Sequence, residues 1–292
     1  MPVTMHGRQT AEPGPTPAAA GTADRRLLDE AIHAVDLAMS YLQRQCPGRV
    51  TSKGDRDMAS EADFAVERTV RQVLAERTPH IGFRGEETGS IGPDDEQWIL
   101  DPIDGTANFV HGIPLCAVSL GLRQAGEAVL GVVGLPFLRR RYWAAAGLGA
   151  YRDGAPISAR RTLQISEAIV AVGDYSTGLD AAARNRADHA LHRRLAAVVQ
   201  RVRMLGSAAL DLVWVAEGGL DASITLSNRP WDMTAGVVIA REAGADVVDA
   251  DGTRHGFVSS TTIAVVPELR ADVTALVSAA LADAGYLPQV SP

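Results

Sequence analysis

Two carboxylates stand three positions apart in the segment WILDPIDGTANF, which covers residues 98–109. The apolar run Trp98–Leu100 leads straight into Asp101, and Asp104 follows two positions after Pro102. Because proline cannot donate a backbone hydrogen bond, we expect a strand that ends at Asp101 and carries this residue at its tip. Two acids held together at the end of an apolar strand call for positive charge between them.

The next two residues, Gly105 and Thr106, offer a main chain suited to an anion. Gly105 permits a tight backbone approach, and Thr106 begins a turn or helix whose N–H groups point outward. Two carboxylates beside this backbone would repel a phosphate unless cations intervened. Mg²⁺ is such a cation, because it takes oxygen ligands and keeps positions for phosphate and water. The spacing predicts a metal-bridged phosphate site, although D-x-x-D alone is more simply a turn with a helix cap.

Three other segments carry acids that could join this site. FRGEETG ends a short strand in Glu86 and Glu87, and RPWDMTAG places Asp232 at the start of an apolar helix. In SEAD, Ser60 and Asp63 begin a further helix with the spacing of a capping box, which would explain Asp63 without chemistry. Asp232 has a similar alternative as a dipole partner at its helix N-terminus. Each structural explanation suffices alone, but their coincidence beside D-P-I-D-G-T favours one shared site.

The hydrophobic pattern predicts the elements that must position these acids. Helical spacing starts at Leu27 and ends at Pro47-Gly48, and a second helix begins near Ser60. Strand-like runs with short connections then predict an antiparallel sheet, at residues 81–83, 97–100, 117–123, 128–135 and 141–146. After residue 165 strands and helices alternate, which is typical of an α/β half. The strands are expected at 168–172, 222–225, 246–248 and 262–266, and the helices at 182–199, 207–217, 232–242 and 268–284.

We divide the chain into three parts. Residues 1–24 are rich in Pro, Ala, Gly and Thr without periodicity, and we expect a disordered tail there. Residues 25–164 form an N-terminal α+β half with the antiparallel sheet and most acidic motifs. Residues 165–292 form a C-terminal α/β half that completes the site.

Composition narrows the classes of partner and compartment. The chain has 46% hydrophobic and 22% charged residues and a formal net charge of −7, without a long basic segment, which argues against a nucleic-acid partner. No apolar stretch of about 18 residues exists, so we expect no membrane partner. The two cysteines lack C-x-x-C spacing, which predicts unpaired thiols in a reducing, cytoplasmic location.

WILDPIDGTANFVH resembles the hallmark segment of the inositol monophosphatase family. GEE upstream and WDMTAG downstream occur in that family's order and at its spacing, and GSAALDLVWVAEGGLDA, residues 206–222, is similar to its helix before the last site aspartate. The resemblance runs from about residue 27 to 280. It implies a layered α-β-α-β-α sandwich with the site between two halves, and a homodimer.

The resemblance also implies a role for each matching position. Two or three Mg²⁺ ions would be bound by Glu86, Asp101, the carbonyl of Ile103, Asp104 and Asp232. Asp63 and the hydroxyl of Thr106 would orient and deprotonate a metal-activated water, and Glu86 would share a third ion. The substrate would contact Asp104, the amides of Gly105 and Thr106, Ala208, Thr225 and Asp232. Lys53 and Asp57 resemble an upstream lysine-acid segment, where Lys53 could balance excess negative charge.

Two departures from the family pattern concern selectivity. Thr234 stands where a small Ala or Cys is usual, and we expect little effect. Thr225 stands seven positions before Asp232, where inositol-phosphate hydrolases of the family carry an acid that binds substrate hydroxyls. Threonine cannot offer the two charged acceptors of a carboxylate. Asn228 and Arg229 could supply a different recognition surface, although Arg229 could equally be solvated or face a dimer partner.

The sequence therefore predicts an enzyme, a Mg²⁺-dependent phosphoric monoester hydrolase that acts on an inositol-phosphate-like, sugar or polyol phosphate. Three alternatives from the same superfamily stay open, namely a histidinol-phosphate, fructose-1,6-bisphosphate or 3′-phosphoadenosine-type phosphatase. A non-catalytic scaffold that keeps the fold is a further alternative. Phosphatases with an aspartyl-phosphate intermediate need a D-x-D motif, whereas this chain offers D-x-x-D.

Overall fold

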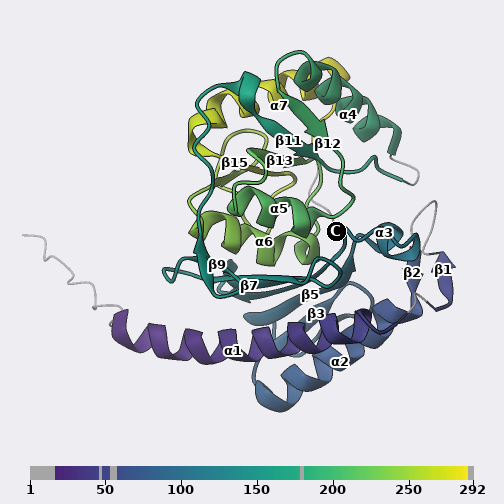
Figure 1. The fold of residues 1–292 in the computed structure, drawn as a ribbon, viewed down its shortest axis with the longest axis vertical. Helices are drawn as coiled ribbons and strands as arrows, with labels where there is room; N and C mark the ends of the chain where they lie inside the picture. Colours follow the sequence, from purple (N-terminus) through teal and green to yellow (C-terminus); the bar gives the residue numbers. More distant parts are fainter. Residues whose placement is uncertain (1–16, 46–47, 53–57, 178–180, 289–292) are drawn as a thin grey trace, which may run out of the picture.

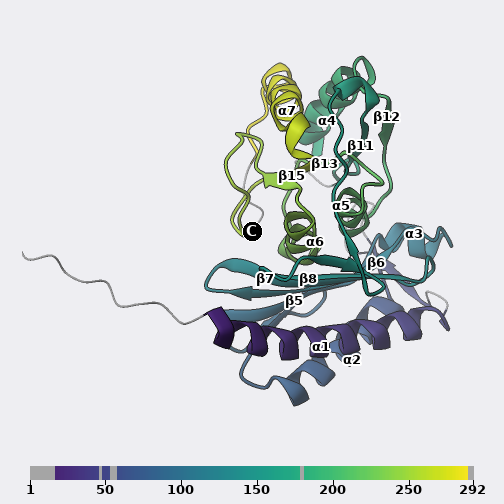
Figure 2. The same ribbon diagram turned by 60° about the vertical axis from the view of Figure 1, so that its left-hand side comes forward.

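Five layers build the molecule, in the order helices, sheet, helices, sheet, helices (Figure 1 and Figure 2). The computed structural model describes residues 17–45, 48–52, 58–177 and 181–288. One sheet has eight strands and the other has five, and a two-stranded sheet of β1 (Val50–Ser52) and β2 (Met58–Ser60) lies at one end. The layers confirm the fold class that the sequence predicts.

Two helices, α1 (Pro17–Leu42) and α2 (Glu61–Arg77), form the outer layer against the larger sheet (Figure 2). Apolar side chains at helical spacing, among them Ala31, Val35 and Leu42 of α1, share one buried cluster with the sheet. The first helix starts and ends earlier than expected, at Pro17 and Leu42, and the second begins within one residue of its predicted start.

The larger sheet is mostly antiparallel, as predicted, with only β3 and β5 pairing in parallel. Its strand order is β10-β9-β8-β7-β6-β5-β3-β4. The strands are β3 (Gly82–Gly85), β4 (Gly89–Ile91), β5 (Glu96–Asp104), β6 (Ala117–Gln124), β7 (Glu127–Leu135), β8 (Arg140–Ala145), β9 (Ala150–Arg152) and β10 (Ala155–Ile157).

The expectation that the strand before Pro102 ends at Asp101 is wrong. β5 continues to Asp104, and its pairing with β6 shifts register between Asp101 and Asp104. Such an irregularity tolerates a proline, whose missing N–H then breaks no ladder hydrogen bond, and it re-aims the neighbouring side chains. The short helix α3 (Thr106–Val110) follows directly.

The middle layer contains α5 (Ala208–Ala216) and α6 (Pro230–Glu242), which lie between the two sheets. α6 packs tightly on the larger sheet because β6 and β7 present glycine to it. A Cβ atom at Gly121 would lie 2.5 Å from the Thr234 side chain, and one at Gly131 would lie 2.3 Å from the Ala235 carbonyl oxygen. This close approach holds the N-terminus of α6, with Asp232, over the end of β5.

The smaller sheet has the strand order β12-β11-β13-β15-β14, with β12, β11 and β13 parallel and β15 antiparallel to both of its neighbours. Helices α4 (Ala181–Ala196) and α7 (Arg270–Ala284) cover its outer face (Figure 1). Its strands are β11 (Ile169–Val172), β12 (Arg201–Arg203), β13 (Ala222–Thr225), β14 (Asp246–Val248) and β15 (Thr262–Val265). The sequence pattern does not predict β12, but it predicts the other four strands and all four helices of this half to within a few residues.

The structure describes no helix that is long and apolar enough to cross a membrane. The tail expected at residues 1–24 lies outside the described residues as far as residue 16, and α1 begins at Pro17. The division of the chain at residues 164 and 165 stays a proposal.

Candidate active site

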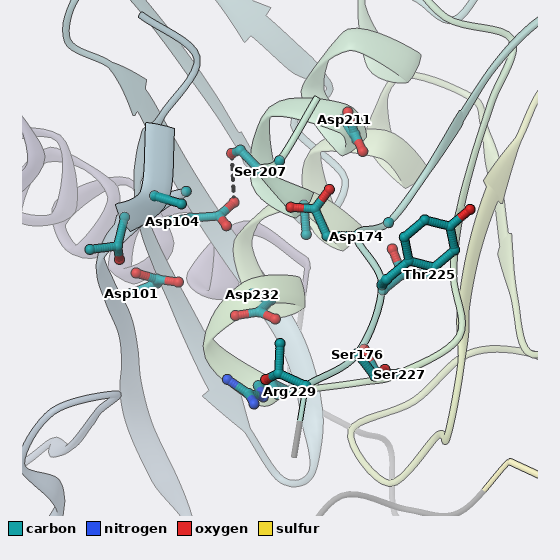
Figure 3. A pocket seen from close by; sticks show the side chains of 18 of the residues that line it. Asp101, Asp104, Asp174, Ser176, Ser207, Asp211, Thr225, Ser227, Arg229 and Asp232 are labelled. Atoms are coloured by element: carbon teal, nitrogen blue, oxygen red, sulfur yellow. Dashed lines mark hydrogen bonds between the residues drawn. The ribbon is translucent and has the colours of Figure 1, made fainter. Parts of the chain in front are cut away.

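A polar pocket of about 320 Å³ opens where the end of β5 meets the N-terminal ends of α5 and α6 (Figure 3). It is lined by every predicted metal ligand and substrate contact, namely Glu86, Asp101, Ile103, Asp104, Gly105, Thr106, Ala208, Thr225 and Asp232. Asp63 stands behind this lining and is hydrogen-bonded to Thr106. Segments separated by more than a hundred residues therefore converge on one cavity, whose size suits a small ligand.

Asp101 lies on the buried part of β5. Its Oδ1 atom accepts a hydrogen bond from the backbone N–H of Ile103 at 3.0 Å, across the irregular stretch that contains Pro102. Burial raises the pKa of Asp101 well above its usual value, and the charges of Glu86 and Asp104 raise it further. Ionised Asp101 is therefore unfavourable unless positive charge enters the pocket.

Asp104 joins β5 to the start of α5. Its Oδ2 atom accepts hydrogen bonds from the Ser207 hydroxyl at 2.7 Å and from the backbone N–H of Ala209 at 2.6 Å. Burial raises the pKa of Asp104 to about 6, while the bonds from Ser207 and Ala209 act in the opposite direction. One carboxylate thus satisfies N-terminal groups of a helix in the other half of the chain.

Gly105 has a conformation and a neighbourhood that exclude a side chain. Its φ of 87° lies in the left-handed region, and a Cβ atom there would lie 2.8 Å from the carbonyl oxygen of Gly206. The chain can therefore turn from β5 into α3 with its backbone exposed to the pocket, as the sequence predicts.

Asp63 serves two contacts at once. Its Oδ2 atom accepts hydrogen bonds from the backbone N–H of Ser60 at 2.7 Å and from the Ser60 hydroxyl at 2.6 Å, so the capping box is present. Its Oδ1 atom accepts a bond from the Thr106 hydroxyl at 3.3 Å, and the same hydroxyl reaches the Ile103 carbonyl oxygen at 3.0 Å. The capping role fixes the carboxylate that faces Thr106.

Glu86 follows β3 directly, and its backbone N–H donates to the Leu100 carbonyl oxygen at 3.1 Å. The turn beyond it is held by Glu67 of α2, a fully buried acid that accepts bonds from the backbone N–H groups of Glu87 and Thr88, both at 2.9 Å. The Thr88 hydroxyl donates to Glu67 as well. Glu67 is not among the residues predicted from the sequence, although an acid among the apolar positions of α2 was a usable signal.

Asp232 is half-buried in the first turn of α6, two positions after Pro230. Burial raises the pKa of Asp232 well above its usual value, Asp104 raises it further, and Arg229 opposes the shift. Arg229 lines the pocket, whereas Asn228 is buried and donates to the Ser259 carbonyl oxygen at 2.8 Å, outside this lining. Lys53 and Asp57 lie outside the described residues.

The donor set fits a hard divalent cation. All candidate ligands offer oxygen atoms, and burial together with neighbouring negative charge makes Asp101 and Asp232 difficult to ionise without cations. Within the described ranges, however, no group of three acidic, histidine or cysteine side chains is arranged to hold an ion. Asp104 instead faces Ser207 and Ala209. Ion binding would therefore require side-chain rotation in this cluster.

Several pocket residues were missed by the sequence analysis. Asp174 and Tyr175 follow β11, Arg184 lies on α4 and Asp211 lies on α5, and all four line the cavity. Asp174, Tyr175 and Arg184 carry no local signal in the sequence, whereas Asp211 stands among apolar residues of α5, within the family-like segment at residues 206–222. They reach the pocket only because β11 pairs with β13 and α5 lies against the larger sheet.

The sequence of this chain is similar to those of known phosphatases. The family model described as the inositol monophosphatase family matches residues 22–282. A probable inositol 1-monophosphatase ImpA of Mycobacterium tuberculosis is 35% identical over 250 residues, which cover 85% of this chain and 92% of that protein. A fructose-1,6-bisphosphatase/inositol-1-monophosphatase of Aquifex aeolicus is 34% identical over 226 residues, which cover 72% of this chain and 83% of that protein.

The fold is also similar to those of solved structures. The extragenic suppressor protein suhB of Bartonella henselae is 31% identical with a TM-score of 0.81, and the match covers 86% of this chain and 98% of that one. An inositol monophosphatase from Anabaena is 30% identical with a TM-score of 0.78, over 87% and 96%.

Proposed function

The chain belongs to the inositol monophosphatase family and is a phosphoric monoester hydrolase, and we propose that it acts on the monoester of a small polyol or sugar with Mg²⁺ as cofactor. One observation carries the proposal: Glu86, Asp101, Asp104 and Asp232 gather around a single pocket beside the contact between Asp63 and Thr106. The superfamily alternatives and the scaffold gain no support from this arrangement. The two relatives named above are a probable inositol 1-monophosphatase and a fructose-1,6-bisphosphatase/inositol-1-monophosphatase.

The family is generally metal-dependent, and we assign its ligands here to the buried oxygen donors. These are Glu86, Asp101, the Ile103 carbonyl, Asp104 and Asp232, for two or three Mg²⁺ ions. When bound, Mg²⁺ would neutralise the carboxylates, lower the pKa of the attacking water and stabilise the leaving alkoxide.

Asp63 and Thr106 would remove the proton of the attacking water. The Thr106 oxygen can accept this proton while its own hydroxyl proton passes to Oδ1 of Asp63. Oδ2 of Asp63 is occupied by the two bonds from Ser60, so only Oδ1 faces the reaction. Backbone N–H groups of Gly105 and Thr106 would bind the phosphate oxygens as negative charge develops.

Phosphate release from inositol 1-phosphate tests the proposal. Protein treated with EDTA should release none, and added MgCl₂ should restore release with a saturable dependence on its concentration. Equal release with and without Mg²⁺ would contradict the cofactor, and no release from any ester in a panel of polyol and sugar phosphates would favour the scaffold.

The family resemblance further supports a homodimer, and the low cysteine content supports a cytoplasmic location. Among the described residues the one free cysteine, Cys116, is fully buried, and burial raises the pKa of its thiol to about 12. Light scattering of the purified protein would test the dimer, and fractionation of the source cells would test the location.

A further inference from the structure

Two of the proposed metal ligands come from segments that are anchored two strands apart in the larger sheet. Glu86 follows β3, whereas Asp232 lies in the first turn of α6, which packs on β6 and β7. The strand β5 lies between β6 and β3. Both acids line one pocket, so their negative charges repel each other. A contact across β5 is needed to hold the two segments together, and the structure contains one.

This contact is a cation–π stack between Arg84 of β3 and Trp231 at the start of α6. The guanidinium carbon of Arg84 lies 5.5 Å from the centroid of the Trp231 ring. Arg84 and Glu86 are two positions apart, so their side chains leave the extended chain on the same face. A Cβ atom at Gly85, between them, would instead meet the carboxylate of Glu67 on α2. Arg84 therefore links the face that carries Glu86 to the helix α6.

Trp231 joins this stack to the helix turn that carries Asp232. Its carbonyl oxygen accepts a hydrogen bond from the Ser119 hydroxyl of β6 at 3.2 Å, so its backbone is attached two strands away from Arg84. Its indole Nε1 atom is buried and has no hydrogen-bond partner in the described part of the chain. The ring is therefore held by its face rather than by its N–H group, and it reaches across β5 from α6 to β3.

A loop between β14 and β15 places a second aromatic ring against the same guanidinium. The ring centroid of Phe257 lies 6.0 Å from the guanidinium carbon of Arg84 and 4.6 Å from that of Arg123 on β6. The loop is attached to the segment before α6, because Asn228 donates to the Ser259 carbonyl oxygen at 2.8 Å. Arg84 thus contacts rings from two different segments, which restricts its rotation.

Arg84 and Trp231 act from behind the pocket. Neither residue belongs to the pocket lining, which includes their neighbours Glu86 and Asp232. Both are half-buried, and a planar guanidinium stacks on an aromatic ring more strongly when water is partly excluded. Arg84 therefore does not contact the substrate, and its effect on the site passes through the stack.

We propose that Arg84 is a positioning residue of the metal site, which holds Glu86 at the distance from Asp232 that Mg²⁺ binding requires. This inference rests on the proposed function, because the two acids are assigned there as Mg²⁺ ligands. The expected effect has the opposite sign to a simple effect of charge. Removing a cation near the acids would by itself strengthen Mg²⁺ binding, whereas losing the stack should weaken it.

Isothermal titration calorimetry with MgCl₂ tests the inference without substrate, on full-length protein that has been stripped with EDTA and dialysed. In Arg84→Ala the dissociation constant for Mg²⁺ should rise about tenfold, the usual effect of losing a residue that orients metal ligands. Arg84→Lys keeps a cation that can lie over the ring and should restore part of the affinity. Trp231→Leu removes the ring without changing the charge and should weaken Mg²⁺ binding as well. Adding Arg84→Ala to Trp231→Leu should then have little further effect, because the two residues act as one pair.

The control is Arg68→Ala, which removes an exposed cation of α2 and should leave the Mg²⁺ affinity unchanged, because exposed charges are screened by salt. Equal or tighter Mg²⁺ binding in Arg84→Ala would overturn the inference, including when its unfolding temperature falls. Additive effects of the Arg84 and Trp231 substitutions would also overturn it. If Arg84→Ala does not fold, Trp231→Leu carries the test, and wild-type affinity in that variant overturns the inference. Failure of the wild-type protein to bind Mg²⁺ would instead overturn the proposed function.

Discussion

Asp104 at the end of β5 accepts a hydrogen bond from the hydroxyl of Ser207, the N-cap residue of α5, at 2.7 Å. The same hydroxyl accepts from the backbone N–H of Leu210 at 3.3 Å. Ser207 therefore caps its own helix and holds a proposed metal ligand from the other half of the chain. The site depends on this contact, because it holds Asp104, a proposed metal ligand, against the N-terminus of α5.

Ser207→Ala should destabilise the protein by about 1–2 kcal/mol and reduce phosphatase activity. The loss combines a helix N-cap with a buried hydrogen bond to a carboxylate. Urea unfolding and phosphate release measure the two effects. Ser278→Ala is a suitable control. Ser278 lies on α7, where its hydroxyl donates to the Ala250 carbonyl oxygen at 3.2 Å, and its loss should affect activity little. Full activity in Ser207→Ala would show that Asp104 does not need this anchor.

Glu67→Gln should raise the Mg²⁺ concentration required for half-maximal activity, by about tenfold, with a smaller effect on kcat. Glutamine keeps one acceptor but turns an NH₂ group toward donors from Glu87 or Thr88, so one of them loses its partner. The turn that positions Glu86 would then loosen. A fall in stability without any change in Mg²⁺ dependence would show that Glu67 is only structural.

The matched control for Glu67 lies on the same helix. Glu76 is exposed and its carboxylate contacts Gln72 one turn earlier, at 3.1 Å. Glu76→Gln removes one negative charge from α2 without touching the turn after β3. We expect its Mg²⁺ dependence and its unfolding midpoint in urea to match those of the wild-type protein.

The sequence predicted much of this arrangement where the signal is local. The capping box of Ser60 and Asp63, the glycine turn at Gly105 and the strand before Asp101 each follow from neighbouring residues, and the structure contains all three. The predicted end of that strand, at Asp101, was wrong. A proline normally excludes a central strand, and no local pattern indicates the register shift that lets β5 continue past Pro102.

The part of the pocket that Asp174 and Asp211 line could not be predicted in this way. Asp174 lines the same pocket as Thr225 because β11 pairs in parallel with β13, a strand about fifty residues further along the chain. Asp211 stands in a helix that is apolar on every side, which indicates burial, but no local pattern shows that this acid lines the pocket. Tertiary placement, rather than residue type or spacing, makes these acids part of the pocket.

Asp101→Asn should abolish phosphatase activity, by a factor of at least about 10³, while the fold survives. Asparagine can still accept the bond from the Ile103 N–H, and it removes the burial of a charged group and the repulsion from Glu86 and Asp104, which together raise the pKa of Asp101. Without Mg²⁺ the variant should therefore unfold at the same temperature as wild type or higher. The stabilisation that Mg²⁺ gives to the wild-type protein should be lost. Thermal unfolding with and without MgCl₂ separates the two effects, and turnover close to wild type would contradict the metal assignment.

His255 should make the protein less stable as the pH falls from about 6.5 to about 4. It is 4% exposed, its Nε2 atom lies 2.9 Å from the Thr262 hydroxyl oxygen, and burial followed by the charge of Arg241 lowers its pKa to about 4. Because the unfolded chain binds a proton at higher pH than the folded chain, acidification favours unfolding in this window. The full effect is about 3 kcal/mol.

Other groups titrate in the same range, so the prediction concerns a difference between two proteins. Burial raises the pKa of Asp188 to about 7, which makes the folded state lose stability as the pH rises, opposite in sign to the effect of His255. His255→Gln keeps a polar group near Thr262 and cannot be protonated. Urea unfolding at pH 5 and pH 7 should show a smaller gain in stability with rising pH for the variant than for wild type. Equal pH dependence in both proteins would mean that His255 is protonated in the folded state as readily as in the unfolded chain.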